Sequence, residues 1–481
     1  MSQDLVSFAI DQARTKGSEY AEARYQKTFD LACLLRNGVP EPATMVDAEG
    51  IGVRIIFEGA LAFGATNQLS RENISALIER LVSNAKSASR ILKEKIHFSS
   101  EEAHVAKWSA EEQKKVEDVS LESMISLLKD IDSTLNGSIA DVTFPNRMLV
   151  AGYEVDEKFY ANTDGSKLES RVPRVYYQNI LVAMYEGKPR TVSIPPGFAT
   201  LGGSGGWEII DNLNLPERIP SGAKQITTAV KAIDKAPTDE SLDVILGPGV
   251  SALTSHESCG HPGEADRILG REGAQAGESF LKPEKLGMEI GSSDAMVSDD
   301  PTIPHSMGFY MYDDEGVKAT KRRLITNGKF TEFLQNRATA EFFGVKSNGS
   351  SRAVQFDREP IIRMANTFIE PGDWSFEEML REIRRGVYIR SFMEWNIDDK
   401  RLNQRYVGLE AFMIENGEVK NPVKDPVLEI TTPKYWGSID ARAKDLEFVC
   451  ATCGKGDPMQ GAPVFTGGPH IRLRDVRVGS R

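Results

Sequence analysis

Two histidines and a glutamate lie close together in the segment His256-Glu257-Ser-Cys-Gly-His261. Two imidazole rings can bind a Zn²⁺-type ion, and a carboxylate beside the first ring can accept a proton from a water molecule on that ion. This chemistry is hydrolytic, and a peptide bond is its expected target. We therefore predict a metal site with His256 and His261 as ligands and Glu257 as the general base.

The two histidines are spaced differently from the familiar pattern H-E-x-x-H, in which the ligands stand four positions apart on one helical face. Here they stand five positions apart. At about 100° per residue, such positions diverge by roughly 140° on an ideal α-helix. A π-type turn would bring both rings back towards one face, and Gly260 gives the backbone the freedom for it. The sequence therefore predicts a π-type turn inside the motif.

A catalytic zinc site usually has three protein ligands and one position left for water. The candidates for the third ligand lie just after the motif or far from it: Glu264, Asp266, His305, Cys450, Cys453 and His470. Cys453 is favoured, because a glycine follows it and the amides of a turn can stabilise a thiolate. Cys450 and Cys259 are then expected to be small buried hydrophobic residues.

An alternative use of the same residues is a closed Cys₂His₂ site, in which Cys450 and Cys453 both bind the ion. Such a site would be purely structural and would give Glu257 no role. Glu257 beside the first histidine therefore favours the catalytic interpretation, with Cys453 alone as the third ligand.

The composition is that of an ordinary globular protein. The chain has 481 residues, a net charge of −12, 40% hydrophobic residues and four cysteines. The negative charge argues against nucleic acid as the main partner. No run approaches the roughly 20 apolar residues of a membrane helix, and the first residues lack the features of a secretory signal. Few cysteines in a long chain fit a reducing compartment, so we expect a cytoplasmic protein.

The pattern of elements predicts an α+β fold, with an α/β-type N-terminal region and a β-rich C-terminal domain that carries the metal-binding helix. We expect an N-terminal α/β domain (1–96), a charged linker (97–118), a central α+β domain (119–236) and a C-terminal catalytic domain (237–481).

Hydrophobic periodicity predicts individual elements within these parts. Helices are expected at 3–16, 70–93, 121–135, 223–235 and 250–261, and strands at 20–35, 142–183 and 242–246. Hairpins are expected at 50–67, at Asn327-Gly328 and at Asn416-Gly417. Ser375 and Glu378 form a capping box that opens a short helix. The glycine cluster within 202–206 lacks the context of a phosphate-binding loop, so we expect an ordinary loop there.

The chain resembles the TldD-type metallopeptidases of the TldD/PmbA (TldE) family over most of its length. The most specific matching segments are Leu246-Gly-Pro-Gly, the motif 256–261, and Glu264-x-Asp266; others are Pro301–Pro304, Tyr312–Gly316, Arg363–Thr367, Cys453-Gly-Lys and, more weakly, Gly50–Ile55. The resemblance implies a metal held by His256, His261 and Cys453, with Glu257 as base. It also implies a dimer, in which a PmbA/TldE-like partner could enclose the site so that only unfolded peptides enter.

The expected function is thus a metal-dependent peptidase that acts on unfolded or small peptides. A His₂Cys donor set suits Zn²⁺ but also Fe²⁺ or Co²⁺. An extended peptide could add to a sheet edge in the C-terminal half, and Asn366 and Asp313-Asp314-Glu315 are candidates to line the site. Two alternatives stay open: a scaffold stabilised by a closed Cys₂His₂ site, and an amidase for modified peptides.

Overall fold

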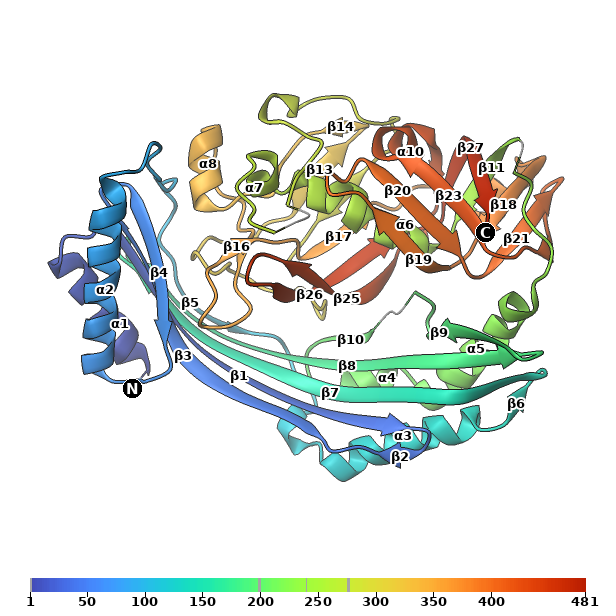
Figure 1. Cartoon of the computed structure of the whole chain (residues 1–481), viewed down its shortest axis with the longest axis horizontal. Helices are drawn as coiled ribbons and strands as arrows, with labels where there is room; N and C mark the ends of the chain where they lie inside the picture. The colour runs from blue at the N-terminus through green and yellow to red at the C-terminus, as the bar shows by residue number, and fades with distance from the viewer. Residues whose placement is uncertain (1, 198–199, 239, 275–276) are drawn as a thin grey trace.

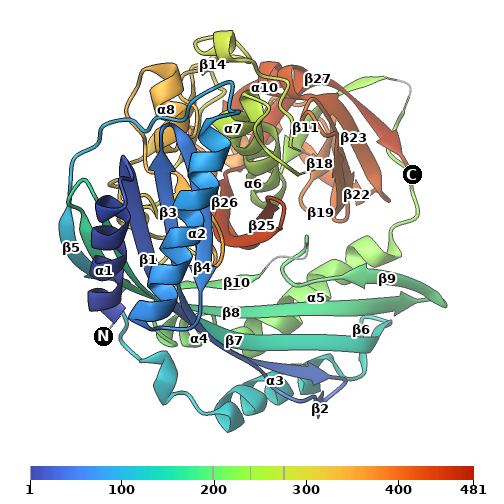
Figure 2. The ribbon, with the colours of Figure 1, turned by 60° about the vertical axis from the view of Figure 1, so that its left-hand side comes forward.

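The computed structural model of the chain describes residues 2–197, 200–238, 240–274 and 277–481. It is an α+β protein, which confirms the expected fold class. A long, curved sheet forms one layer, and the C-terminal region lies over its concave side (Figures 1 and 2). Within the described residues, no helix is long and apolar enough to cross a membrane.

The curved sheet has ten strands in the order β10-β8-β7-β1-β3-β4, with four short strands paired at its margins. Its main strands are β1 (Tyr20–Arg36), β3 (Thr44–Phe57), β4 (Ala60–Thr66), β7 (Val142–Asn162), β8 (Lys167–Tyr185) and β10 (Leu201–Ser204). The marginal strands are β2 (Val39–Pro40), β5 (Val105–Ser109), β6 (Ser138–Ile139) and β9 (Lys188–Val192). Because β1 pairs with both β3 and β7, one sheet runs through residues from the first and the central part of the chain.

Helices cover the other side of this sheet in two groups, each with its own apolar core. One group is α1 (Ser2–Thr15) and α2 (Arg71–Ser89), which pack on β1, β3 and β4. The other is α3 (Leu121–Leu135), α4 (Glu208–Asn212) and α5 (Leu215–Lys231), which lie against β7, β8 and β10.

The C-terminal region contains a nine-stranded sheet, a six-stranded sheet and a two-stranded ladder. The nine-stranded sheet consists of β11 (Ser241–Leu246), β18 (Arg385–Ile389), β19 (Phe392–Ile397), β20 (Asn403–Gly408), β21 (Ala411–Glu415), β22 (Glu418–Pro422), β23 (Pro426–Thr431), β24 (Ile439–Arg442) and β27 (Ile471–Ser480). The six-stranded sheet has the order β14-β13-β12-β17-β26-β25. Its strands are β12 (Val297–Asp299), β13 (Arg322–Thr326), β14 (Lys329–Phe330), β17 (Asn366–Ile369), β25 (Glu447–Lys455) and β26 (Gln460–Gly468).

Short helices complete this region and share its large apolar core. They are α6 (Pro248–Ser255), α7 (Ala265–Ile268), α8 (Arg337–Phe343), α9 (Phe376–Arg381) and α10 (Thr432–Ser438), and the two-stranded ladder is β15 (Ser351–Arg352) with β16 (Ile361–Ile362). Helix α6 follows β11 directly and packs on β17, β25 and β26. The structure therefore places the end of α6 next to the edge strand β25.

Most expected elements are confirmed, including the hairpin turns at Asn327-Gly328 and Asn416-Gly417 and the capping box at Ser375. Three differ. The central strands are two long ones, β7 and β8. Helix α5 begins at Leu215, eight residues before the expected start at 223, and ends at Lys231. The segment 97–118, expected to be a linker, contains β5, which pairs with β8.

The glycine cluster expected to be a loop contributes strand β10 instead. A Cβ atom at Gly202 would lie 2.0 Å from the Val175 carbonyl oxygen, and one at Gly203 would lie 2.3 Å from the His305 carbonyl oxygen. Glycine is needed at these positions because another main-chain segment passes too close to leave room for a side chain. Ligand binding is not required to explain them.

Candidate metal centre

The motif histidines lie on a distorted helical segment at the end of α6. Residues His256–Gly260 form a π-helical turn, and His261–Gly263 continue as a 3₁₀ turn. The two imidazole rings lie 4.8 Å apart, centre to centre, at an interplanar angle of 81°. The expected π-type turn is thus confirmed, and it brings side chains five positions apart onto one side.

Gly260 is required by packing as well as by backbone freedom. A Cβ atom at this position would lie 1.9 Å from the Met364 sulfur, and Met364 is itself fully buried. The π-helical turn therefore presses directly against the segment that leads into β17.

Three buried side chains, His256, His261 and Cys453, bring their potential ligand atoms within 4.8 Å of one another. The Cys453 sulfur lies 3.5 Å from His261 Nε2. Tetrahedral zinc with ordinary Zn–N and Zn–S bonds would place such atoms about 3.6 Å apart. The structure thus brings together the two motif histidines and the distant cysteine that the sequence favours.

The chemistry of these donors also fits a metal ion. His256 Nδ1 is buried and has no hydrogen-bond partner, which is unusual for a polar atom in a protein interior. Burial raises the pKa of the Cys453 thiol, but the positive charges of His261 and Arg363 outweigh this and bring it down to about 7. A thiolate is therefore accessible near neutral pH, as a metal ligand requires.

Cys450 does not take part in this cluster. It lies three positions before Cys453 on β25, and the two side chains point to opposite faces of a strand at that spacing. Its thiol donates to the Gly202 carbonyl oxygen at 3.3 Å, and burial raises its pKa. In the described parts of the chain, the donors assembled are two histidines and one cysteine, not the closed Cys₂His₂ set.

Glu264 supports a ligand. Its carboxylate accepts a hydrogen bond from His261 Nδ1 at 2.9 Å and another from Arg267 Nε at 2.6 Å. Burial raises the pKa of Glu264, but Lys455, His261 and Arg267 together hold it well below its usual range. Because Nδ1 carries the proton that it donates to Glu264, the Nε2 atom of His261 keeps a free lone pair. This atom faces Cys453 and can serve as the metal ligand. Asp266 is instead bound by Lys455 at 2.7 and 2.8 Å.

Glu257 forms an ion pair that the sequence did not reveal. Arg401 Nη1 donates to Glu257 Oε2 at 2.5 Å, and both side chains are almost buried. Burial raises the pKa of Glu257, but the charges of His261, Arg401 and His256 outweigh this and lower it. Glu257 is therefore a charged carboxylate beside His256, His261 and Cys453, the three side chains that we call the metal cluster.

Arg401 is held in place by the tight turn between β19 and β20. Its backbone is left-handed, with φ of 62°, and its carbonyl oxygen accepts a hydrogen bond from the Thr432 hydroxyl at 2.7 Å. Its neighbours Asp398 and Leu402 close the turn through a hydrogen bond of 2.7 Å from the Leu402 amide. No sequence signal linked this turn to a motif 144 positions earlier.

The metal cluster opens into a cavity of ≈ 590 Å³ between the curved sheet and the C-terminal region. The curved-sheet side contributes Gln178, Pro196, Gly197 and Thr200; the other side contributes the motif, Phe392, Trp395, Arg401 and residues 449–454 of β25. The cavity thus runs along one side of the edge strand β25, and the metal donors form part of its wall.

Six further sequence candidates lie elsewhere. His305 contacts the Ser204 carbonyl oxygen, and His470 lies between Asp445 and Tyr388. Asn366 is fully buried and binds main-chain groups and Ser306. None of Asp313, Asp314 and Glu315 lines this cavity; Glu315 accepts from the Arg54 side chain and the Arg337 amide. The expectation that these acidic residues and Asn366 line the site is therefore wrong.

A buried His₂Cys donor set beside a charged glutamate is the arrangement of a metal-dependent hydrolase. Three family models match the chain: the PmbA/TldA metallopeptidase domain 1 over 21–85, the central domain over 114–236 and the C-terminal domain over 239–480. The chain therefore belongs to the PmbA/TldA metallopeptidase family, which confirms the resemblance seen in the sequence.

Relatives that are named as metalloproteases align with this chain over almost its whole length. A metalloprotease of Methanocaldococcus jannaschii is 30% identical and covers 94% of this chain and 96% of its own. A zinc metalloprotease TldD homolog of Saccharolobus solfataricus is 26% identical, with 98% of each chain covered. The crystal structure of TldE from Thermococcus kodakarensis has the same fold, with a TM-score of 0.72 and 18% identity over 99% of this chain and 100% of that one.

Replacing Gly260 by alanine should disturb the metal cluster, because the new methyl group would collide with Met364. We expect Gly260→Ala to lower the free energy of unfolding by about 1–3 kcal/mol through overpacking and to reduce metal content. Gly249→Ala, in α6, is the matched control, since a Cβ atom there meets nothing within 4 Å. Thermal unfolding and elemental analysis measure both effects; equal behaviour of the two variants would contradict the packing argument.

Proposed function

We propose that this protein hydrolyses peptide bonds with a zinc ion held by His256, His261 and Cys453. The observation that carries the proposal is the buried His₂Cys cluster with Glu257 next to its first histidine. The word zinc in the name of the Saccharolobus solfataricus relative supports that metal. The same donors suit Fe²⁺ or Co²⁺, so the metal is a matter for measurement.

When bound, a zinc ion supplies a Lewis acid that lowers the pKa of water to about 7 and polarises the scissile carbonyl. Glu257 is the residue that accepts the proton of the attacking water and passes it to the leaving amine. Its lowered pKa keeps it charged and ready to accept that proton. Arg401 holds one carboxylate oxygen of Glu257, so that the carboxylate keeps one orientation.

The substrate is proposed to be an extended, unfolded peptide that adds to the free edge of β25. This strand pairs with β26 on one side, and in the described residues its other side carries only a bridge from Cys450 to Thr200. A peptide bound along that edge would pass Cys453 and would be recognised mainly by main-chain hydrogen bonds, largely without regard to sequence. A folded protein would not fit between the curved sheet and β25.

The protein is further proposed to act in the cytoplasm as a dimer, with itself or with a PmbA/TldE-like subunit. All four cysteines are free and buried, which fits a reducing compartment. The shared fold with TldE from Thermococcus kodakarensis supports a partner of the same architecture.

Metal content should distinguish the two cysteines of β25. Cys453→Ser is expected to lose the ion, because a hydroxyl is a poor replacement for a thiolate ligand. Cys450→Ser should retain it, since this side chain faces Gly202. Elemental mass spectrometry of both purified variants tests this directly. Loss of metal from both would support a closed structural site instead.

Glu257→Gln should lose activity without losing the ion. Glutamine has nearly the same shape but cannot accept the proton, so we expect kcat to fall by about 10²–10⁴-fold. Cleavage of an unstructured peptide, followed by mass spectrometry, gives the rate, and elemental analysis gives the occupancy. Full activity in a metal-loaded Glu257→Gln variant would exclude this residue as the base.

Arg401 should act as a positioning residue for Glu257. Arg401→Met removes the ion pair, and we expect kcat to fall by about 10–100-fold with KM nearly unchanged, because the carboxylate is no longer oriented. Arg401→Lys should recover part of kcat, since an ammonium can reach the same oxygen. The proposed role is wrong if the methionine variant keeps its kcat, or if KM alone changes.

A further inference from the structure

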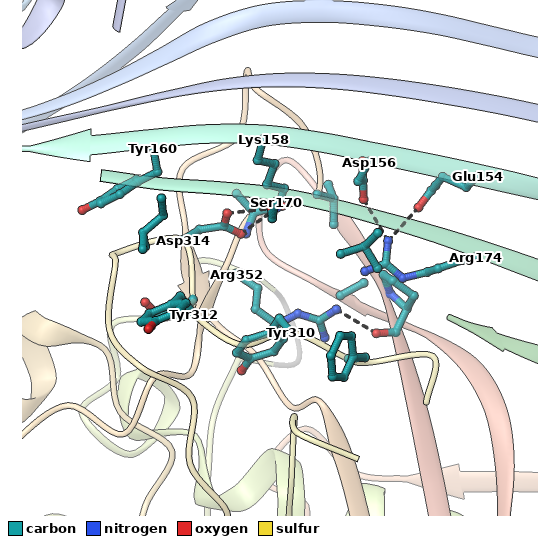
Figure 3. Close-up of a pocket in the computed structure, with 18 of the residues that line it drawn as sticks. Glu154, Asp156, Lys158, Tyr160, Ser170, Arg174, Tyr310, Tyr312, Asp314 and Arg352 are labelled. Carbon is teal, nitrogen blue, oxygen red and sulfur yellow. Dashed lines mark hydrogen bonds and ion pairs between the residues drawn. The ribbon is translucent and has the colours of Figure 1, made fainter. Parts of the chain in front are cut away.

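A second, smaller cavity also lies between the curved sheet and the C-terminal region (Figure 3). Its volume is ≈ 90 Å³, and it shares no lining residue with the cavity that contains the metal donors. An engineered cavity of about 150 Å³ accepts benzene, which has six non-hydrogen atoms, so in proportion this one can hold a molecule of roughly four. We call it the Arg352 cavity; it is lined by β7, β8, Trp108 of β5, the loop 309–314, residues 352–354 and residues 461–463 of β26.

Arg352 is a buried cation in the wall of this cavity. Only 8% of the residue is exposed. Its guanidinium donates to the carbonyl oxygens of Met364 at 2.7 Å and Pro463 at 2.9 Å, and lies over the Tyr310 ring at 5.4 Å. In the described residues, no carboxylate lies within ion-pairing distance of it. A buried guanidinium normally has a carboxylate or similar anion beside it.

The other charged groups of the cavity already have partners. Lys158 binds Asp314 at 2.9 and 3.0 Å, and Arg174 binds Asp156 at 2.9 Å and Glu154 at 3.3 Å; these pairs are among the dashed contacts in Figure 3. Among the described residues, Arg352 therefore has no carboxylate of its own to balance its positive charge.

The remaining carboxylates do not supply the missing charge. Asp313 accepts hydrogen bonds from three backbone amides. Burial, together with the charge of Asp156, raises the pKa of Glu154 to about 7, so that near neutral pH this group carries less than a full negative charge. Burial, and to a smaller extent the nearby cations Arg174 and Arg363, lower the pKa of Arg352 to about 10.

Aromatic side chains form the apolar part of the wall. Trp108 and Phe309 contact each other edge to face, with ring centres 5.8 Å apart, and Tyr310 and Tyr312 come from the same loop as Phe309. These rings offer a surface for a short aliphatic group, and the planar guanidinium fits a carboxylate.

We propose that the Arg352 cavity binds a small carboxylate, with its charged group on Arg352 and its aliphatic part against Trp108, Phe309 and Tyr310. The ligand is a very small carboxylic acid, such as acetate, or the smallest free amino acid, glycine; both share the carboxylate. The proposal depends on this cavity alone and stands whether or not the metal centre cleaves peptides.

Titration calorimetry with acetate, glycine and ethylammonium tests the proposal on the whole chain. Acetate should bind saturably at millimolar concentration, and ethylammonium should not bind. Glycine distinguishes the two sources of the carboxylate: binding tighter than acetate identifies an amino acid site, and weaker binding identifies a site for simple acids. Absence of binding by both carboxylates overturns the proposal.

Single-residue variants test where the carboxylate binds. Arg352→Gln removes the charge but keeps a side-chain donor, and it should weaken carboxylate binding by about tenfold or more. Arg323→Gln, at an exposed position of β13, makes the same charge change at the surface and should have no effect. His256→Ala should also leave binding intact, since His256 belongs to the other cavity.

Binding that is lost in His256→Ala and kept in Arg352→Gln would place the carboxylate at the metal donors and refute the proposal. If Arg352→Gln does not fold, Ser170→Leu provides a second test, because Ser170 lines the cavity from β8 and a larger side chain would fill it. Unchanged binding in a folded Ser170→Leu protein would likewise refute it.

Discussion

The geometry of the candidate metal centre depends on the buried carboxylate of Glu264. This group is fully enclosed and is surrounded by three cationic or hydrogen-donating partners: the ring of His261, Arg267 and Lys455. Glu264 follows the motif by three residues, and Lys455 follows Cys453 by two. Removing one partner of such a buried cluster would leave charge without compensation, which typically costs several kcal/mol. The cluster therefore fixes the end of the helical motif against β25, and with it His261 against Cys453.

The residues of the candidate site come from segments with different structural roles. The motif is anchored by β11 and α6 in the large core, Cys453 lies on an edge strand, and Arg401 is carried by a turn of the other sheet. Within the described residues, the curved sheet supplies no candidate metal donor; it faces the cavity with residues of β8 and the segment before β10. The candidate donors and the proposed base thus come from the C-terminal region, while the curved sheet limits what can approach them.

Much of the site was predictable because it is local or chemically distinctive. The five-residue spacing of the histidines required a π-type turn, and a cysteine before a glycine was a recognisable third donor. Three features could not be read from the sequence. Nothing in the sequence distinguishes Arg401 from other arginines in turns, and only the fold shows that it lies beside Glu257. The role of Glu264 depends on which atom of His261 it meets. The glycines of β10 resemble a loop because the main chain that approaches them comes from distant residues, Val175 and His305.

The extra residue in the motif has a consequence for how this chain can change. Deleting one residue between Glu257 and His261 would recreate the common four-residue spacing, and an ordinary α-helical turn could then replace the π-helical turn that accommodates the extra residue. If the turn stayed π-helical instead, His261, Glu264 and Arg267 would rotate together by one residue, about 100° on an α-helix, whereas Lys455 and Cys453 would stay with their strand. The five-residue spacing and the π-helical turn are therefore a matched pair, and a deletion keeps the contacts between this helix and β25 only if the helix changes type at the same place.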